Sequence, residues 1–315
     1  MGGQQRILVI KLSALGDFVQ AMGPFAAIRA HHPAARITLL TTKPFAALAG
    51  QSPYFDEVWT DSRPRPWEVA GLIRLRKMLR SVKFDMVYDL QTSDRSSSYF
   101  HIMGDPPWSG IANSCSHPHA NPDRDLMHTI ERQAEQLVMA GIPSTPPADL
   151  SWATADVARF NLPERYALIV PGGAPHRPFK RWPADRFAAV ANHLALQGVV
   201  PLVLGTRDDD DQIKVVTTDC PTARSLSGQT SFTDVIVLAR RAVGAVGNDT
   251  GPMHLIAAAG CPAVVLFSAD SDPALCAPRG RVAVLRKDDL STLAVDEVLA
   301  ALAAGPAALR EPAAV

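Results

Sequence analysis

Short runs rich in Ile, Val and Leu alternate with longer segments of helical period along almost the entire chain. This alternation is typical of strand-helix-strand units, which build a parallel sheet covered by helices. In the first half we expect strands at 6–12, 36–41, 57–60 and 85–90, with helices near 17–31, 44–50, 67–82 and 94–103. The pattern predicts an α/β fold with a doubly wound parallel sheet.

The alternation breaks at the Pro-rich stretch 141–147 and then begins again. Such stretches are typical of linkers, and 315 residues suffice for two domains. In the second half we expect strands at 166–171, 199–205, 242–247, 263–267 and 282–285, with helices near 184–197, 208–218, 232–241, 251–260 and 292–304. We therefore predict two Rossmann-like domains, 1–150 and 151–315, facing a cleft, with a frayed tail at 305–315.

Composition and charge exclude several classes of function. Lys and Arg number 31 and Asp and Glu also number 31, so the chain lacks the basic excess that binds nucleic acid. Its four cysteines form no C-x-x-C pair and are interpreted as reduced thiols. No apolar run approaches the roughly 20 residues needed to span a bilayer, and the first residues do not resemble a signal peptide. We expect a cytoplasmic protein whose membrane contact, if any, is peripheral.

Ligands of open α/β sheets bind beyond the carboxyl ends of the strands, so the loops after the strands are candidate sites. The first of these loops, 11–17, reads Lys-Leu-Ser-Ala-Leu-Gly-Asp. It lacks the G-x-G-x-x-G pattern of a nicotinamide-binding turn. Its last residue, Asp17, has two interpretations: an acid that favours the positive end of its helix, or a general base facing the cleft.

The strongest local pattern is the segment 242–254, in which a buried strand enters a tight turn and then a helix. Asn248 or Asp249 can cap this helix, Gly251 permits close backbone approach, and Pro252 suits a first helical turn. The free amides and the helix dipole of such a turn can hold a diphosphate. His254 either reaches a phosphate or sugar oxygen or is a structural histidine.

Charged residues follow two other strands of the second half. In the loop 171–183, Lys180 is placed to neutralise a departing phosphate, whereas Arg177 and Arg181 are interpreted as solvated. In the acidic run 208–211, Asp208 is the candidate for binding a ribose hydroxyl pair, and the other acids are interpreted as solvated charges of a helix start.

The segment 63–83 carries seven basic residues against one acid, with apolar residues interleaved. It is interpreted either as an amphipathic basic helix that contacts a phosphorylated or anionic-membrane partner, or as a solvated outer helix face. The His-containing stretches 115–119 and 31–32 offer no third ligand at metal spacing, so we predict no metal site.

Several motifs together resemble one family. They are K-x-S-A-L-G-D at 11–17, D-x-Q-x-x-x-R-S at 89–96, H-x-x-x-R at 128–132, K-R-W-P at 180–183, N-D-T-G-P-M-H-L-x-A-A at 248–258 and L-F at 266–267. This set, which runs through nearly the whole chain, resembles the family 9 glycosyltransferases, the ADP-heptose:lipopolysaccharide heptosyltransferases. The resemblance implies a GT-B architecture, with the acceptor bound by the first domain and the nucleotide-sugar by the second.

The resemblance also implies an activity and a set of site residues. Members are inverting and metal-independent, and need no cofactor besides the nucleotide-sugar donor; the acceptor is a phosphorylated glycolipid of the lipopolysaccharide inner core, at the cytoplasmic face of the inner membrane. Asp17 resembles the base and Lys180 the lysine that offsets diphosphate charge. The resemblance implies Asp208, Asp249, Thr250, Gly251, Pro252, Met253 and His254 as donor-binding residues and Ser13, Gln91 and Arg95 as acceptor-side residues.

Three alternatives remain open from the sequence. The chain can be a related transferase that uses another sugar or an acceptor other than lipopolysaccharide. It can be a sugar-nucleotide epimerase, which shares the two-domain architecture but needs no acceptor. It can also be a nucleotide-sugar binder without chemistry, although a pure binder needs no base such as Asp17 in the opposite domain.

Overall fold

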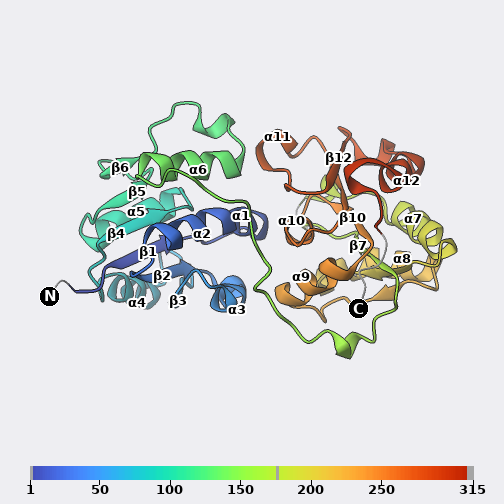
Figure 1. Cartoon of the computed structure of the whole chain (residues 1–315), viewed down its shortest axis with the longest axis horizontal. Coiled ribbons are helices and arrows are strands. Elements are labelled where there is room, and N and C mark those ends of the chain that lie inside the picture. Colours follow the sequence, from blue (N-terminus) through green and yellow to red (C-terminus); the bar gives the residue numbers. More distant parts are fainter. Residues whose placement is uncertain (1–2, 175–176, 311–315) are drawn as a thin grey trace. The chain divides into compact units, whose positions relative to one another are not determined.

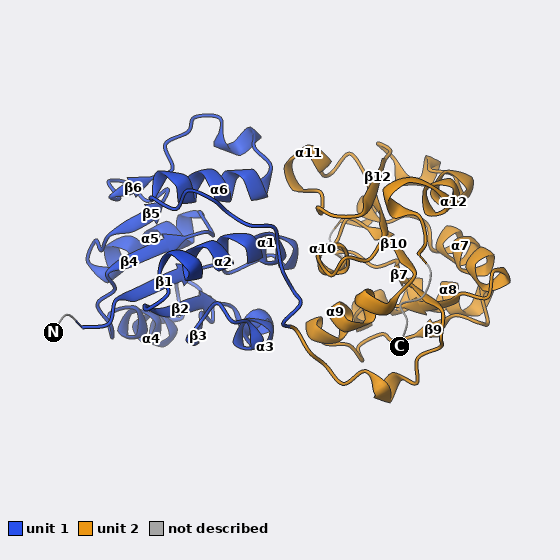
Figure 2. Ribbon diagram, viewed as in Figure 1, with its two compact units in different colours: residues 1–152 blue, residues 153–315 orange. Residues whose placement is uncertain are grey.

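The computed structural model describes residues 3–174 and 177–310. The chain divides into two compact units, unit 1 (Met1–Trp152) and unit 2 (Ala153–Val315), coloured separately in Figure 2. The division follows Trp152, in the segment after the Pro-rich stretch. No helix within the described residues is long and apolar enough to cross a membrane.

Unit 1 is built on a parallel sheet of six strands in the order β3-β2-β1-β4-β5-β6 (Figure 1). The strands are β1 (Arg6–Ile10), β2 (Arg36–Thr41), β3 (Glu57–Thr60), β4 (Met86–Asp89), β5 (Trp108–Gly110) and β6 (His117–Pro118). The helices are α1 (Leu15–Gln20), α2 (Met22–His31), α3 (Lys43–Gln51), α4 (Val69–Leu79), α5 (Asp94–Met103) and α6 (Thr129–Met139), with a 3-10 turn at Arg124–Leu126.

Apolar strand residues explain why this sheet forms. The central strand β1 is buried from Ile7 to Ile10, and it pairs in parallel with β2 on one side and β4 on the other. Continuous apolar runs of this kind suit a parallel strand that is covered on both faces. One core cluster joins Leu8 and Ile10 to Leu75 and Leu79 of α4 and to Trp108. All the loops that leave the carboxyl ends of these strands therefore start from one edge of the sheet.

Unit 2 repeats this plan with the strand order β12-β11-β10-β7-β8-β9. Its strands are β7 (Tyr166–Val170), β8 (Val200–Val203), β9 (Arg224–Ser225), β10 (Gly244–Asn248), β11 (Ala263–Phe267) and β12 (Val282–Arg286). Its helices are α7 (Ala184–Leu196), α8 (Asp210–Asp219), α9 (Phe232–Arg241), α10 (Gly251–Ala258), α11 (Pro273–Cys276) and α12 (Val295–Ala303). Its 3-10 turns are Ala158–Phe160, Pro178–Lys180, Arg207–Asp209, Leu290–Thr292 and Gly305–Ala307.

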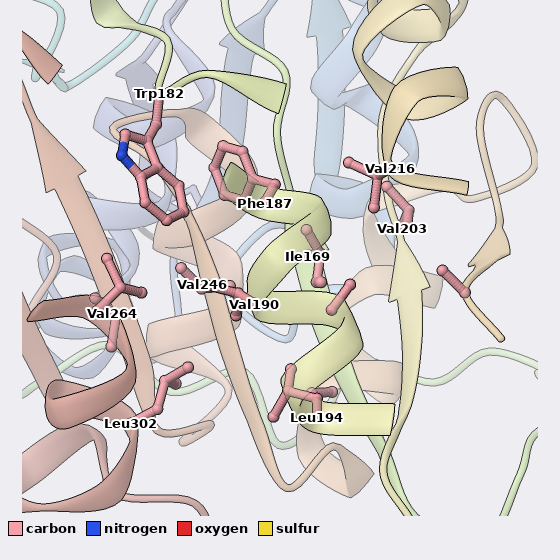
Figure 3. Close-up of a cluster of buried hydrophobic side chains, with 14 of the residues drawn as sticks. Ile169, Trp182, Phe187, Val190, Leu194, Val203, Val216, Val246, Val264 and Leu302 are labelled. Carbon is pink, nitrogen blue, oxygen red and sulfur yellow. The ribbon is translucent and has the colours of Figure 1, made fainter. Parts of the chain in front are cut away.

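The core of unit 2 includes a buried cluster between the sheet and α7, with α12 on the same side (Figure 3). Trp182 and Phe187 meet edge to face, with ring centroids 4.9 Å apart. The Trp182 indole N–H donates to the carbonyl of Leu293 at 3.0 Å, which satisfies the polar atom that burial of this side chain removes from water. Because Trp182 directly follows Lys180 and Arg181, this packing anchors the loop that carries those cations.

The structure confirms the predicted α/β fold and departs from the expected elements in particular places. The helix expected at 17–31 is two helices, α1 and α2, which meet at Ala21. Pro24 is the third residue of α2, where its missing N–H costs no helical bond, so the chain begins a new helix at Met22 rather than continuing α1. The basic segment 63–83 is helical only from Val69 to Leu79, because Pro64 and Pro66 precede that helix. The expected elements omitted β5, β6, α6, β9 and α11.

The tail is a second correction, because residues 305–310 are attached to unit 2 rather than frayed. Ala307 is fully buried, and the Leu309 N–H donates to Leu302. The Arg310 backbone N–H donates to Val243, and its guanidinium donates to the carbonyl of Ala242 at 2.9 Å. The accepting carbonyls lie in the last turn of α12 and in the two residues between α9 and β10, so the segment 305–310 is held by both. Residues 311–315 lie outside the described residues.

Candidate functional site

In unit 1, the loop after β1 is joined to the loop after β4. The Gln91 side-chain oxygen accepts the backbone N–H groups of Leu12 at 2.8 Å and Ser13 at 3.0 Å. The Lys11 ammonium donates to the carbonyl of Leu90 at 2.9 Å. Gln91, which the sequence placed on the acceptor side, therefore fixes the backbone of the turn that carries Ser13. The side-chain oxygen of Gln91 is thus used to hold this loop.

Asp17 lies in the first turn of α1 and is half-buried. Its Oδ2 accepts a hydrogen bond from the backbone N–H of Ala14 at 3.2 Å. This is the helix-start role that the sequence left open. A carboxylate has further lone pairs beyond the one used here, so the contact leaves Asp17 able to accept a proton.

Ser13 is held by Arg63, a residue of the basic segment 63–83 that was not among the predicted site residues. The Arg63 guanidinium donates to Ser13 Oγ at 2.9 Å, and Arg63 precedes α4 rather than belonging to it. The Arg63 backbone N–H donates to Asp61, a buried carboxylate that also accepts the Tyr99 hydroxyl at 2.5 Å. Burial, together with this carboxylate, raises the pKa of Tyr99. Asp61 thereby fixes the loop from which Arg63 reaches Ser13.

Arg95 is also engaged in the structure of this loop. It lies in the first turn of α5, and its guanidinium donates to the carbonyl of Pro64 at 2.8 Å. The residues Ser13, Gln91 and Arg95, predicted from two separate motifs, thus belong to one connected set of contacts at the carboxyl edge of the sheet of unit 1. Arg63 and Asp61 complete that set.

Two charged side chains are buried behind this edge. Lys11 is almost completely buried, and desolvation lowers the pKa of its ammonium, while the nearby Asp17 carboxylate raises it. Asp89, at the end of β4, is fully buried, and burial raises its pKa to about 6. Its Oδ1 accepts the backbone N–H groups of Gln91 and Thr92, whereas its Oδ2 has no hydrogen-bond partner among the described residues.

In unit 2, Asn248 at the end of β10 joins two loops. It is fully buried, and its amide N–H groups donate to the carbonyls of Pro171 at 2.8 Å and Gly172 at 3.1 Å. Its side-chain oxygen accepts the Trp182 backbone N–H at 2.9 Å. Asn248 is therefore not the helix cap. The N-cap position of α10 belongs to Thr250, and Gly251 and Pro252 begin the helix.

Lys180 lies beside the same turn and forms an ion pair with Asp249. The distance from Lys180 Nζ to Asp249 Oδ2 is 2.7 Å, and the two side chains are only 13% and 10% exposed. The donor-side lysine and the donor-side acid predicted from separate motifs are thus brought into direct contact. The contact positions the ammonium next to the first turn of α10.

A cavity of about 340 Å³ opens at this edge of unit 2. It is lined by residues from the loops after β7, β8 and β10, including Gly172, Gly173, Asp208, Asp209, Thr250 and Gly251. Pro252 also lines it. Asp249, Met253 and His254 are not among its lining residues, and the Met253 side chain is fully buried in the core. His254 is buried one turn into α10.

Of the acidic run 208–211, the acid that organises the cavity is Asp209 rather than Asp208. Asp209 is buried, and its carboxylate accepts the backbone N–H of Gly173 at 3.2 Å and both the N–H and the hydroxyl of Thr206 at 3.0 Å. A Cβ at Gly172 would lie 2.3 Å from the Asp209 carboxyl carbon, so only glycine permits this approach. Asp208 is exposed.

Asp209 also explains a cation that the sequence interpreted as solvated. Arg181 is mostly buried, lies 3.8 Å from the Asp209 carboxylate and donates to the carbonyl of Gly173. Arg177 is exposed, as interpreted, and residues 175–176 of the same loop lie outside the described residues. Among the residues that the structure describes, no group of three or more His, Cys, Asp or Glu side chains is placed to hold a metal ion.

Comparison with known proteins gives consistent matches over most of the chain. The chain is 26% identical to lipopolysaccharide heptosyltransferase 2 of Escherichia coli K12 over 294 residues, which cover 84% of this chain and 83% of that protein. A glycosyltransferase family 9 structure from Veillonella parvula superposes with a TM-score of 0.83 at 21% identity, covering 95% of this chain and 96% of that one. The structure of E. coli ADP-heptose lps heptosyltransferase II gives a TM-score of 0.76 at 22% identity, covering 95% and 97%.

The structural matches confirm the predicted GT-B type fold of two Rossmann-like units. The profile of glycosyltransferase family 9 (heptosyltransferase) matches residues 72–290. This span includes residues 72–83 of the basic segment, the residues Gln91 and Arg95, and all the lining residues of the cavity of unit 2. The chain therefore belongs to glycosyltransferase family 9 (heptosyltransferase), and it is a glycosyltransferase.

Proposed function

We propose that this glycosyltransferase transfers heptose from ADP-heptose to an inner-core acceptor of lipopolysaccharide, with inversion at the anomeric carbon and without a metal ion. The observation that carries the proposal is the cavity of unit 2, where the Gly172–Gly173 backbone, the start of α10 and the acidic loop meet. The names of its relatives support the choice of substrates, because they describe lipopolysaccharide heptosyltransferases and an ADP-heptose enzyme.

On the donor side, we propose that the nucleotide occupies the cavity of unit 2 and that its diphosphate lies against the start of α10. The first amides of a helix lack intrahelical acceptors and carry the positive end of the helix dipole, so they favour an anion. Lys180, held near this turn by Asp249, supplies the positive charge that offsets charge on the leaving diphosphate. Asp208 at the rim of the cavity is the group proposed to meet a ribose hydroxyl.

On the acceptor side, we propose that Asp17 removes the proton from the attacking hydroxyl. The carboxylate is half-buried, and it accepts the backbone N–H of Ala14, the residue after Ser13, whose hydroxyl accepts a hydrogen bond from Arg63. A nucleophile made more basic and a leaving group made less basic are the two needs of displacement at an anomeric carbon. In this proposal the cations and amides of unit 2 take the role that a divalent cation has in other sugar-nucleotide enzymes.

The acceptor proposed here is a phosphorylated glycolipid, so the reaction would take place at the cytoplasmic face of the inner membrane. The proposal requires unit 1 and unit 2 to act on one pair of substrates.

The test is a transfer assay that pairs ADP-heptose with defined truncated core acceptors, with UDP-sugars as competing donors. We expect Asp17→Ala and Lys180→Ala to remain folded and to lose transfer by about a hundredfold or more. Matched controls are Asp94→Ala, which removes an exposed first-turn acid of α5, and Lys214→Ala, which removes an exposed lysine of α8. Both controls should keep transfer.

Three outcomes would contradict parts of the proposal. Full activity of Asp17→Ala would remove the proposed base. A preference for UDP-sugars over ADP-heptose would overturn the donor. Turnover of the nucleotide-sugar without any acceptor would favour the epimerase alternative, and binding without turnover would favour a nucleotide-sugar binder.

A further inference from the structure

The outer face of α4 combines exposed apolar side chains with unpaired cations. Trp67, which precedes the helix, is 70% exposed, and Val69 and Ile73 are 62% and 61% exposed. Val69 and Ile73 are four residues apart and therefore lie next to each other on the helix surface. Contiguous exposed apolar surface is a feature of interaction sites, and this segment places three large apolar side chains in water within seven residues.

The orientation of this face is fixed by the opposite side of the helix. Leu75 and Leu79 are buried in the core of unit 1, and Met78 packs against the same cluster. Figure 1 shows α4 among the helices of unit 1. Because the buried stripe holds the helix against the sheet, Val69 and Ile73 cannot turn inward without removing Leu75 and Leu79 from the core.

Cations continue the exposed face toward the C-terminal end of the helix. Arg74, Arg76 and Lys77 in the helix and Arg80 and Lys83 after it are exposed. None of these five forms an ion pair with a residue that the structure describes, so their charges are available to a partner. Arg65 lies over the Trp67 ring, 5.4 Å from its centroid, and adds a cation at the apolar end.

We propose that this α4 face, formed by Trp67, Val69, Ile73 and the cations from Arg74 to Lys83, is a docking surface for an anionic lipid bilayer. Charge complementarity selects this occupant, since the segment 63–83 holds seven basic residues against the single acid Glu68. Each surface cation attracts anionic lipid, and indole side chains favour the headgroup region. The apolar residues then enter the boundary between headgroups and acyl chains, as amphipathic interfacial helices do.

The test is sedimentation of the full chain with vesicles of phosphatidylglycerol and phosphatidylethanolamine at low salt, without nucleotide-sugar or lipopolysaccharide. The result is therefore independent of the proposed function. We expect binding to these vesicles and none to vesicles of phosphatidylcholine alone. The triple variant R74Q/K77Q/R80Q should bind about a hundredfold more weakly, from about fivefold per cation. The matched control K214Q/R241Q/R286Q, which removes three exposed cations of unit 2, should bind like the unchanged protein.

The apolar part of the surface has its own test. The double variant Trp67→Ser, Ile73→Ser should bind these vesicles at least about tenfold more weakly. It removes two apolar side chains whose transfer from water into the bilayer favours binding. Brominated lipid should quench part of the tryptophan fluorescence, and this quenching should disappear in Trp67→Phe. Unchanged binding of the double variant, with loss in the triple variant alone, would indicate a phosphate contact without insertion and would overturn the proposal. Unchanged binding of the triple variant would overturn it as well.

Discussion

Replacing Asp209 by Asn tests whether the buried acid of the run 208–211 holds the cavity of unit 2 together. In the folded protein its carboxylate accepts three hydrogen bonds, one from Gly173 and two from Thr206. An Asn side chain retains one oxygen for Gly173. Its amide N–H groups then face the backbone N–H of Thr206, which loses its acceptor.

The magnitude follows from these contacts. One hydrogen bond to an ionised group is worth about 1.5–3 kcal/mol, and Arg181 also loses the negative charge 3.8 Å away. We expect the free energy of unfolding of unit 2 to fall by about 2–3 kcal/mol. For a domain of this size that is a decrease of roughly 5–10 °C in melting temperature. Because Asp209 anchors Gly173, binding of ADP to the same variant should also weaken.

The assay is thermal unfolding followed by calorimetry, with isothermal titration of ADP as the second measurement. Asp208→Asn is the matched control, since Asp208 is the neighbouring acid and is exposed. Its effect on unfolding should stay within about 0.5 kcal/mol. The reasoning is refuted if Asp209→Asn melts within about 1 °C of the unchanged protein, or if Asp208→Asn is destabilised as much.

Two further predictions concern buried positions. Burial raises the pKa of Asp89 to about 6 in the folded protein, against an ordinary value of 3.8. The folded state therefore favours the protonated carboxyl, and the stability that this preference supplies is complete below pH 3.8 and is lost as the pH rises through 6. In urea unfolding, the free energy of unfolding of Asp89→Asn should rise relative to that of the unchanged protein by up to about 3 kcal/mol between pH 4 and pH 7. A difference between the two proteins that stays constant over this pH range would contradict the burial argument. In Gly247→Ala the new Cβ would lie 2.7 Å from the Val170 Cβ and 2.9 Å from its carbonyl oxygen, so we expect a loss of about 2–3 kcal/mol by calorimetry. The control Gly50→Ala meets nothing within 4 Å and lies in α3, so it should be neutral or slightly stabilising; equal behaviour of the two alanine variants would refute the steric account.

The sequence predicted most of the long elements because their apolar period is strong. The strands 36–41, 57–60 and 263–267 and the helices 94–103 and 232–241 coincide with β2, β3, β11, α5 and α9. Strands of two or three residues, such as β6 and β9, carry too few side chains to show a period. The helix α6 has a clear amphipathic pattern from Thr129 to Met139, so the sequence held a signal there that the expected elements did not use.

The site was predicted less completely, and the missed residues share a physical cause. Asp61, Asp89 and Asp209 are buried, and each holds a loop by accepting hydrogen bonds inside the protein. The spacing of residues along the sequence does not show which acids are buried. A usable signal did exist for Asp209, because Thr206 stands three residues before it in the spacing of a capping box. Asp89 directly follows apolar residues at a strand end, where a carboxylate enters the carboxyl edge of the sheet. The partners of Arg63 depend on a loop fold that no local pattern encodes.

The ion pair of Lys180 with Asp249 bears on how the proposed donor site would act. A lysine side chain loses conformational entropy when it is fixed, and here the 2.7 Å contact has already fixed the ammonium next to the start of α10. A group held in place before the reaction needs no reorganisation as negative charge develops on the leaving diphosphate, so its stabilisation is directed to the transition state. The same carboxylate partly neutralises the ammonium while the diphosphate is merely bound. In the proposed reaction Asp249 would therefore lower ground-state affinity for the donor and position Lys180 for the charge that appears only as the glycosidic bond breaks.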